Sequence, residues 1–221
     1  MQGIILAAML SGAAAAGAPQ SADDLRYERI EPSPKQMAKL QALTPEGVAA
    51  GVDIHDDDLE TIATINTVNA YQSNGGFTDR VRSDNFLRAF VDKRTGAVRY
   101  QLYQTVSYNY VYRNFTGVNY AAANGPQTAS VDGIDHDVIG CAGGPDRCSY
   151  KDTVGFDVTE DQLRWVAGQY VAGNSPFWRF KFRSQAGMDW EDRIAPAEAA
   201  GVLEAVRRYL VKHGVGGATH Q

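Results

Sequence analysis

The stretch Asn85–Phe115, NFLRAFVDKRTGAVRYQLYQTVSYNYVYRNF, predicts a β-hairpin at the centre of an antiparallel sheet. From Val98 to Tyr112, seven of the eight even-numbered positions are apolar or aromatic, and most odd-numbered positions are polar. Because alternate side chains of a strand point to opposite faces, this pattern indicates a strand with one buried face. Gly96 can supply the positive φ angle that a short hairpin loop requires.

The second half of this hairpin is long for a single strand, about 50 Å at roughly 3.3 Å per residue. We therefore expect a bulge or a sharp bend at 104–107, or a break into two strands. Tyr108, Tyr110 and Tyr112 continue the apolar row and are interpreted as core residues. The alternative is an aromatic platform for a sugar or a peptide, which a register slip near Gln104 would produce.

Further strands and two helices complete the predicted fold. Residues 59–71, 128–140, 148–158 and 176–183 have the composition or alternation of strands, although the spacing in 59–71 also permits a helix. Thr159 and Gln162 match a capping box that starts a helix ending at Gly173, and a second helix runs from Pro196 to a cap at Gly214. The expected fold class is α+β: a curved antiparallel sheet of about six strands with two helices packed on one face, one inserted before the last strand and one C-terminal.

The N-terminal part differs in composition from the rest. Residues 3–18, GIILAAMLSGAAAAGA, are apolar, small and uncharged, which is typical of a secretory signal peptide. No Lys or Arg precedes this run, so an alanine-rich tail or a short helix is the alternative. The predicted organisation is a signal peptide at 1–18, a polar, acidic segment with a possible short helix at 19–58, a single α+β domain at 59–214 and a flexible tail at 215–221.

The charge distribution excludes some classes of function. The net charge is −5, and residues 20–65 alone carry ten acidic and four basic residues. A nucleic-acid-binding protein usually has a clear basic excess, so we predict no nucleic-acid partner. No apolar run of 18 residues is flanked by charges, which predicts no membrane span.

Two cysteines lie close together around a turn. Cys141 and Cys148 flank AGGPDR, and a disulfide across this short loop would contribute about 2–3 kcal/mol in the chain-entropy model. Such a bond indicates an oxidising compartment and agrees with a periplasmic or secreted protein. Zinc needs about four ligands, and no second pair of Cys or His stands at a suitable spacing, so neither a metal nor a cofactor is predicted.

Acidic clusters are the first candidates for chemistry. Asp53–Asp58 lacks the glycine and the distal glutamate of an EF-hand loop and is interpreted as a solvated segment. In the predicted strand 128–140, Asp135 and Asp137 share one face and His136 lies on the other. Paired carboxylates on one face are suited to acid–base work, but an exposed acidic face is the simpler interpretation. No nucleophile-elbow motif or P-loop is present.

Basic residues on the polar faces of two predicted strands are the second group of candidates. If the two strands are neighbours, their side chains form one cationic face suited to a carboxylate, a phosphate or an acidic polysaccharide. The alternative is a solvated face neutralised by carboxylates on adjacent strands. The candidate ligand-binding residues are Arg99, Tyr103, Arg113, Arg179, Lys181 and Arg183.

These observations lead to two hypotheses about function. The first is a secreted or periplasmic binding or interaction protein without catalysis, whose partner is a small anionic ligand or another protein of the cell envelope. The second is a small exported hydrolase that uses Asp135 and Asp137, with His136. The absence of a catalytic motif favours the first hypothesis, and convergence of these side chains in a concave pocket would favour the second.

Overall fold

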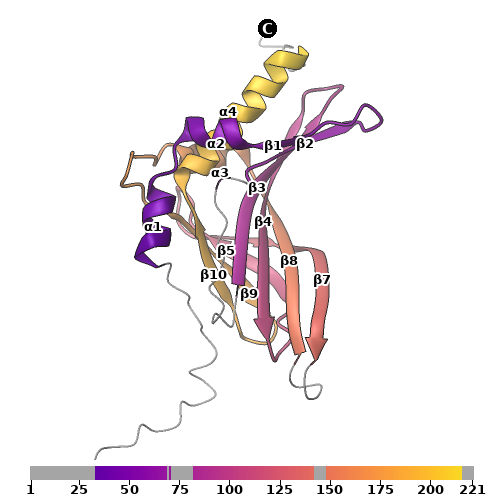
Figure 1. Ribbon diagram of the computed structural model, residues 1–221, viewed down its shortest axis with the longest axis vertical. Helices are drawn as coiled ribbons and strands as arrows, with labels where there is room; N and C mark the ends of the chain where they lie inside the picture. The colour runs from indigo at the N-terminus through magenta and orange to yellow at the C-terminus, as the bar shows by residue number, and fades with distance from the viewer. Residues whose placement is uncertain (1–32, 69, 71–81, 142–147, 216–221) are drawn as a thin grey trace, which may run out of the picture.

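The computed structural model describes residues 33–68, 70, 82–141 and 148–215. The predicted signal peptide, and the tail beyond Val215, lie outside these residues. The α+β class and the six-stranded antiparallel sheet are confirmed, and a second, four-stranded sheet joins them. Figure 1 shows the two sheets lying one over the other, with helices gathered at one end.

The strands form two antiparallel sheets. The six-stranded sheet has the order β1 (Asp53–His55), β2 (Ile62–Asn66), β3 (Arg82–Asp92), β4 (Val98–Asn109), β8 (Cys148–Val158), β7 (Asp132–Cys141). The four-stranded sheet has the order β10 (Trp190–Ile194), β9 (Trp178–Ser184), β5 (Phe115–Tyr120), β6 (Gln127–Ser130). The helices of the described residues are α1 (Pro34–Gln41), α2 (Pro45–Gly51), α3 (Glu160–Ala167) and α4 (Pro196–His213).

The predicted hairpin is β3 and β4, and β4 is a regular strand. It pairs with β3 on one side and with β8 on the other without a shift of register. The bulge or break expected at 104–107 is therefore wrong: β4 pairs without interruption with β3 as far as Ser107 and with β8 as far as Asn109. The chain then leaves the sheet at Tyr110, whose φ of 79° is unusual for a bulky residue.

The even row within β4 faces the core, as predicted, but Tyr110 and Tyr112, which were interpreted as core residues, lie beyond β4 and are 52% and 44% exposed. Leu102, Val106 and Tyr108 are buried, and the facing β8 residue Phe156 contacts Trp178, Phe180 and Phe182 of the second sheet. The core thus lies between two sheets, where burial of each large apolar side chain contributes about 1.5–3 kcal/mol. The prediction of one sheet lacked this second layer and strand β10.

The chain changes sheets twice where one strand had been expected. The run 128–140 is divided at Val131 into β6, in the smaller sheet, and β7, at an edge of the larger sheet. The segment Tyr110 to Asn114 carries the chain from β4 in the larger sheet to β5 in the smaller sheet. Its first and last residues, Tyr110 and Asn114, both have positive φ angles. Alternation of side chains identified strand conformation in both stretches but carried no information on which sheet each strand joins.

The helices follow their capping signals. Ser33 and Gln36 form a capping box at α1, Thr159 caps α3, and Gly214 ends α4 in the left-handed conformation. Helix α3 ends at Ala167, earlier than the predicted Gly173. Helix α1 is the short helix predicted in the acidic segment 19–58, whereas helix α2 and strand β1 of the same segment had not been predicted.

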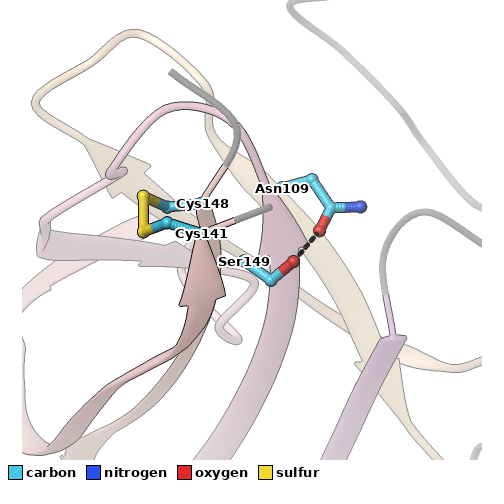
Figure 2. The surroundings of a disulfide bond; sticks show 4 residues. All are labelled: Asn109, Cys141, Cys148 and Ser149. Atoms are coloured by element: carbon cyan, nitrogen blue, oxygen red, sulfur yellow. Dashed lines mark hydrogen bonds between the residues drawn. A yellow bond between two sulfur atoms is a disulfide. The ribbon is translucent and has the colours of Figure 1, made fainter. Parts of the chain in front are cut away.

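The predicted disulfide is present. Cys141 and Cys148 are directly opposite each other in the β7–β8 pair and are bonded. Figure 2 shows the bond beside the hydrogen bond from Ser149 Oγ to Asn109 Oδ1 (2.6 Å), which links β8 to the end of β4. The two bonds therefore fasten together three strand ends at one corner of the large sheet.

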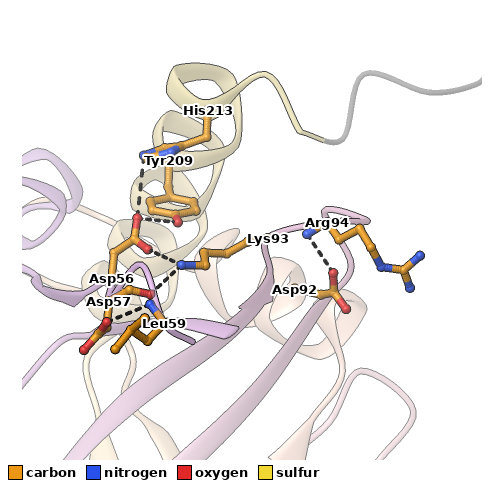
Figure 3. A network of polar contacts seen from close by, with 8 residues as sticks. All are labelled: Asp56, Asp57, Leu59, Asp92, Lys93, Arg94, Tyr209 and His213. Atoms are coloured by element: carbon orange, nitrogen blue, oxygen red, sulfur yellow. Dashed lines mark hydrogen bonds and ion pairs between the residues drawn. The ribbon is translucent and has the colours of Figure 1, made fainter. Parts of the chain in front are cut away.

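Asp56 ties the acidic segment to the C-terminal end of α4. Its carboxylate accepts hydrogen bonds from Tyr209 Oη (2.7 Å) and Lys93 Nζ (3.0 Å), and His213 Nε2 lies 3.9 Å away. Figure 3 shows these groups converging: Asp56 from the loop after β1, Lys93 from the β3–β4 turn, and Tyr209 and His213 from α4. The hydrogen bond from Tyr209, followed by that from Lys93, lowers the pKa of Asp56. This acidic residue is thus a structural link rather than a merely solvated group.

Candidate functional site

The predicted basic face is not assembled. Strands β4 and β9 belong to different sheets, and each turns its apolar row inward, so their basic rows point away from each other. Arg99 pairs with Asp157 (2.7 Å), Arg179 with Glu191 (3.2 Å) and Arg183 with Asp189 (3.3 Å). Lys181 stands opposite Glu191 in the β9–β10 register. The condition for one cationic surface, that the strands be neighbours, is not met.

Tyr103 and Arg113 are buried rather than displayed. The Tyr103 ring stacks on Phe86 (5.1 Å between centroids) beneath the Arg88 guanidinium, 4.3 Å from the ring. The Arg113 guanidinium lies 4.8 Å from the centre of the Tyr108 ring. Both side chains contribute to packing, and the roles of these six residues as ligand contacts stay predictions without a common site.

A groove between α3, α4 and the start of β4 is one candidate site in the described part of the chain. It encloses about 500 Å³, within the range of small-molecule sites. Its walls come from helical positions that recur every three or four residues and so share a face. The lining residues that the argument uses are Val98, Tyr100, Ala167, Ala200, Leu203 and Leu210.

The interior of the groove is apolar and neutral. Ala167 and Ala200 face it from the two helices, and their small side chains leave the volume open. Burial, and to a smaller extent the charge of Glu160, raises the pKa of Tyr100 to about 12, so its phenol stays uncharged. Leu203 and Leu210 of α4 are both partly exposed and border the groove.

The rim of the groove carries ion pairs. Arg164 Nε donates to Glu160 Oε1 (2.9 Å) on α3. On α4, Glu204 accepts from Arg207 and from Arg208, each through side-chain nitrogens at 2.7–2.8 Å. These hydrogen bonds, that of Arg207 first, lower the pKa of Glu204 to about 2. The lining itself carries two guanidinium groups, those of Arg164 and Arg207, and two carboxylates. Arg208, outside the lining, brings a third guanidinium group to Glu204.

A second, smaller pocket lies beside edge strand β7. It encloses about 240 Å³, and its lining includes Tyr112, Asn114, Asp135, His136 and Asp152. The convergence that the sequence left open is therefore partly present: Asp135 and His136 meet in a pocket, but Asp137 does not line it. Asp137 stands opposite Lys151 in the β7–β8 register.

His136 is held by a residue that sequence analysis did not identify. Its Nδ1 lies 2.5 Å from Asp152 Oδ1, and Tyr108 Oη donates to Asp152 Oδ2 at 2.5 Å. Asp152 is 4% exposed. The sequence signal for it was a single acidic residue on the apolar row of β8, because Val154, Phe156 and Val158 share its face.

The groove residues were missed for a different reason. Arg164 and Arg207 have the pattern of ordinary surface residues on two amphipathic helices, and the periodicity of a helix does not encode its distance from another helix.

Comparison with known protein families, with curated proteins and with solved structures gave no match. In the described residues, no group of three or more His, Cys, Asp or Glu side chains is placed to hold a metal ion. None of the described helices is both long and apolar enough to cross a membrane.

Proposed function

We propose that this chain is an exported binding protein that holds an anionic amphiphile, such as a fatty-acid carboxylate, in the groove between α3 and α4. The observation that carries the proposal is the groove itself: about 500 Å³ of mainly apolar space beneath a rim that carries the guanidinium groups of Arg164 and Arg207. An acyl chain would cover Leu203, Leu210 and Val98, and each buried methylene contributes about 0.8 kcal/mol.

The rim supports a preference for anions. Each guanidinium group has five N–H donors, so Arg164 and Arg207 keep donors beyond those directed at Glu160 and Glu204. A ligand carboxylate at the rim would join an existing charge network rather than enter a neutral surface. Export is supported by the Cys141–Cys148 disulfide, which is typical of an oxidising compartment, together with the signal-like residues 3–18.

The proposal is tested by calorimetric titration of the full chain with three ligands that share a dodecyl chain: dodecanoate, dodecanol and dodecyltrimethylammonium. We expect dodecanoate to bind most tightly and the cationic analogue least tightly. Substitution Ala200→Phe fills the groove and should weaken dodecanoate binding at least tenfold, which corresponds to about 1.4 kcal/mol.

Two matched variants distinguish the effect of removing an arginine at the groove from that of removing an arginine elsewhere on the surface. Arg164→Gln should weaken the binding of dodecanoate more than that of dodecanol. Arg179 pairs with Glu191 on the other sheet, so Arg179→Gln should leave the affinity for both ligands unchanged. Equal affinity for the three ligands, or full dodecanoate binding by a folded Ala200→Phe variant, would refute the proposal.

A further inference from the structure

The pocket beside β7 contains a chain of three hydrogen-bonded side chains that the binding groove does not use. Tyr108 donates to one oxygen of Asp152, and the other oxygen faces His136 Nδ1. Tyr108 Oη is itself fixed, because it accepts a hydrogen bond from the backbone N–H of Arg113 (3.0 Å). Burial, followed by the hydrogen bond to Asp152, raises the pKa of Tyr108 well above its usual range. The phenol therefore acts as a donor to Asp152.

This arrangement determines which imidazole nitrogen of His136 carries the proton. A carboxylate can only accept, so the neutral His136 ring places its proton on Nδ1 and its lone pair on Nε2. The His136 side chain is 41% exposed, whereas that of Asp152 is 6% exposed. A partly exposed imidazole is thus backed by a buried carboxylate, the arrangement in which a histidine acts as a general base.

The surroundings of His136 keep its ring in place. The Tyr112 ring lies over it at 4.5 Å between centroids, and Tyr150 lies at 6.0 Å. Tyr110 and Asn114, on either side of Tyr112 in the sequence, both have positive φ angles, of 79° and 46°. Backbone strain in residues other than glycine is concentrated at functional sites, and here it positions part of the pocket lining.

We propose that this pocket is a general-base site in which His136 activates water for the hydrolysis of small, uncharged esters. The volume of about 240 Å³ admits only a small substrate. Asp135 and Asp152 in the lining disfavour an anionic one. Asn114 lines the same pocket, and its side-chain nitrogen, which donates to Gln185 Oε1 (2.5 Å), carries a second hydrogen for the substrate oxygen.

The proposed reaction needs no reagent other than water. Water gives one proton to His136 Nε2 while its oxygen bonds to the ester carbonyl carbon. The tetrahedral intermediate then breaks its bond to the alcohol oxygen, and that oxygen takes the proton back from Nε2. Ester and water become carboxylic acid and alcohol, and His136 returns to its neutral form. His136 is the catalytic residue, whereas Asp152 and Tyr108 are positioning residues.

The test uses the full chain and p-nitrophenyl acetate. We expect saturable hydrolysis by the wild-type protein and a loss of at least 100-fold in kcat for His136→Gln, since general-base catalysis contributes roughly 10²–10⁴-fold. His55→Gln is the matched control, because His55 is an exposed histidine on β1, and it should retain the wild-type rate. Hydrolysis that never saturates, or an unchanged rate in His136→Gln, would overturn the proposal.

The variant Asp152→Asn tests whether Asp152 positions the His136 ring or only stabilises the fold. A carboxamide can donate to Nδ1 and so favours the wrong tautomer, which should lower kcat with little change in KM. If this variant does not fold, long-range ¹H–¹⁵N spectra of the wild-type protein decide the point: a proton on His136 Nδ1 supports the assignment, and one on Nε2 overturns it. Hydrolysis should persist in Ala200→Phe, whereas its loss there would place the reaction in the groove instead.

Discussion

At the scale of single residues, Glu198 shows how burial alone changes the behaviour of a side chain. It lies in the first turn of α4, is 1% exposed, and accepts a hydrogen bond from Thr67 Oγ1 (3.2 Å). Loss of hydration outweighs that hydrogen bond and raises the pKa of Glu198 to about 8. The native protein therefore holds this carboxyl in its protonated form at neutral pH.

This raised pKa predicts a loss of stability as the pH rises from about 4.5 to about 8. Between the unfolded pKa, near 4.5, and the folded value of about 8, the folded state binds more protons, so the free energy of unfolding falls as the pH rises. Glu198→Gln keeps an acceptor for Thr67 and removes the titration. We expect its Tm to exceed that of the wild type at pH 8.5 and the difference to disappear near pH 4.5.

Thermal unfolding followed by circular dichroism at these two pH values measures the effect. Glu60→Gln, which changes an exposed glutamate, provides the control and should have a pH profile parallel to that of the wild type. The explanation would be wrong if the profile of Glu198→Gln were also parallel.

At the scale of elements, α4 is fixed at two points along its length. Near its start, Gly201 permits close contact with α2: a Cβ added there would lie 2.4 Å from Val48 Cγ1 and 3.1 Å from the Pro45 carbonyl oxygen. Near its end, Tyr209 and His213 meet Asp56. The sequence alone identified the ends of this helix, but not these two contacts.

Gly201→Ala should destabilise the protein despite the higher helix propensity of alanine. Overpacking of a core contact costs about 1–3 kcal/mol, which outweighs the roughly 1 kcal/mol that alanine gains over glycine in a helix. Chemical denaturation measures the change. Combination with Val48→Ala should recover part of the loss, and a strictly additive double variant would exclude a direct clash.

The link between Asp56 and α4 should weaken in acid. The pKa of Asp56 is lowered in the folded state, so its contribution is complete above the unfolded pKa and is lost as the pH falls through the folded value. We expect Asp56→Asn to lower Tm at pH 7 and to lose this deficit progressively in acid. Thermal unfolding at pH 7 and in acid measures the effect. Asp58 is a neighbouring exposed carboxylate, so Asp58→Asn is the matched control.

At the scale of the whole molecule, the packing of two sheets face to face determines which side chains come into contact. The apolar rows of β4, β8 and β9 meet in the core, and the basic rows that the sequence suggested as one surface are turned to opposite sides. The same arrangement brings Tyr112, from the crossing between the sheets, against His136 of an edge strand. Both candidate sites lie where elements that are distant in the sequence meet. The groove lies at the helix-covered end, and the smaller pocket lies at the β7 edge.

Much of the fold was predictable from local pattern. Period-two alternation located the hairpin and the inward face of β4, and the capping residues Ser33, Thr159 and Gly214 marked helix ends. The pattern failed where the chain changes sheets at Val131 and in the short elements α2 and β1. In those places the conformation depends on distant partners: β1 pairs with β2, and α2 packs on α4.

The sequence by itself determined the α+β class, the β3–β4 hairpin, the helix caps and the Cys141–Cys148 bond, because each depends on residues close together in the chain. Only the tertiary structure decided that Asp152 holds His136 and that Arg164 and Arg207 border one groove. Those contacts depend on which strands pair and how two sheets and two helices pack, and the same alternation of side chains is compatible with many such arrangements.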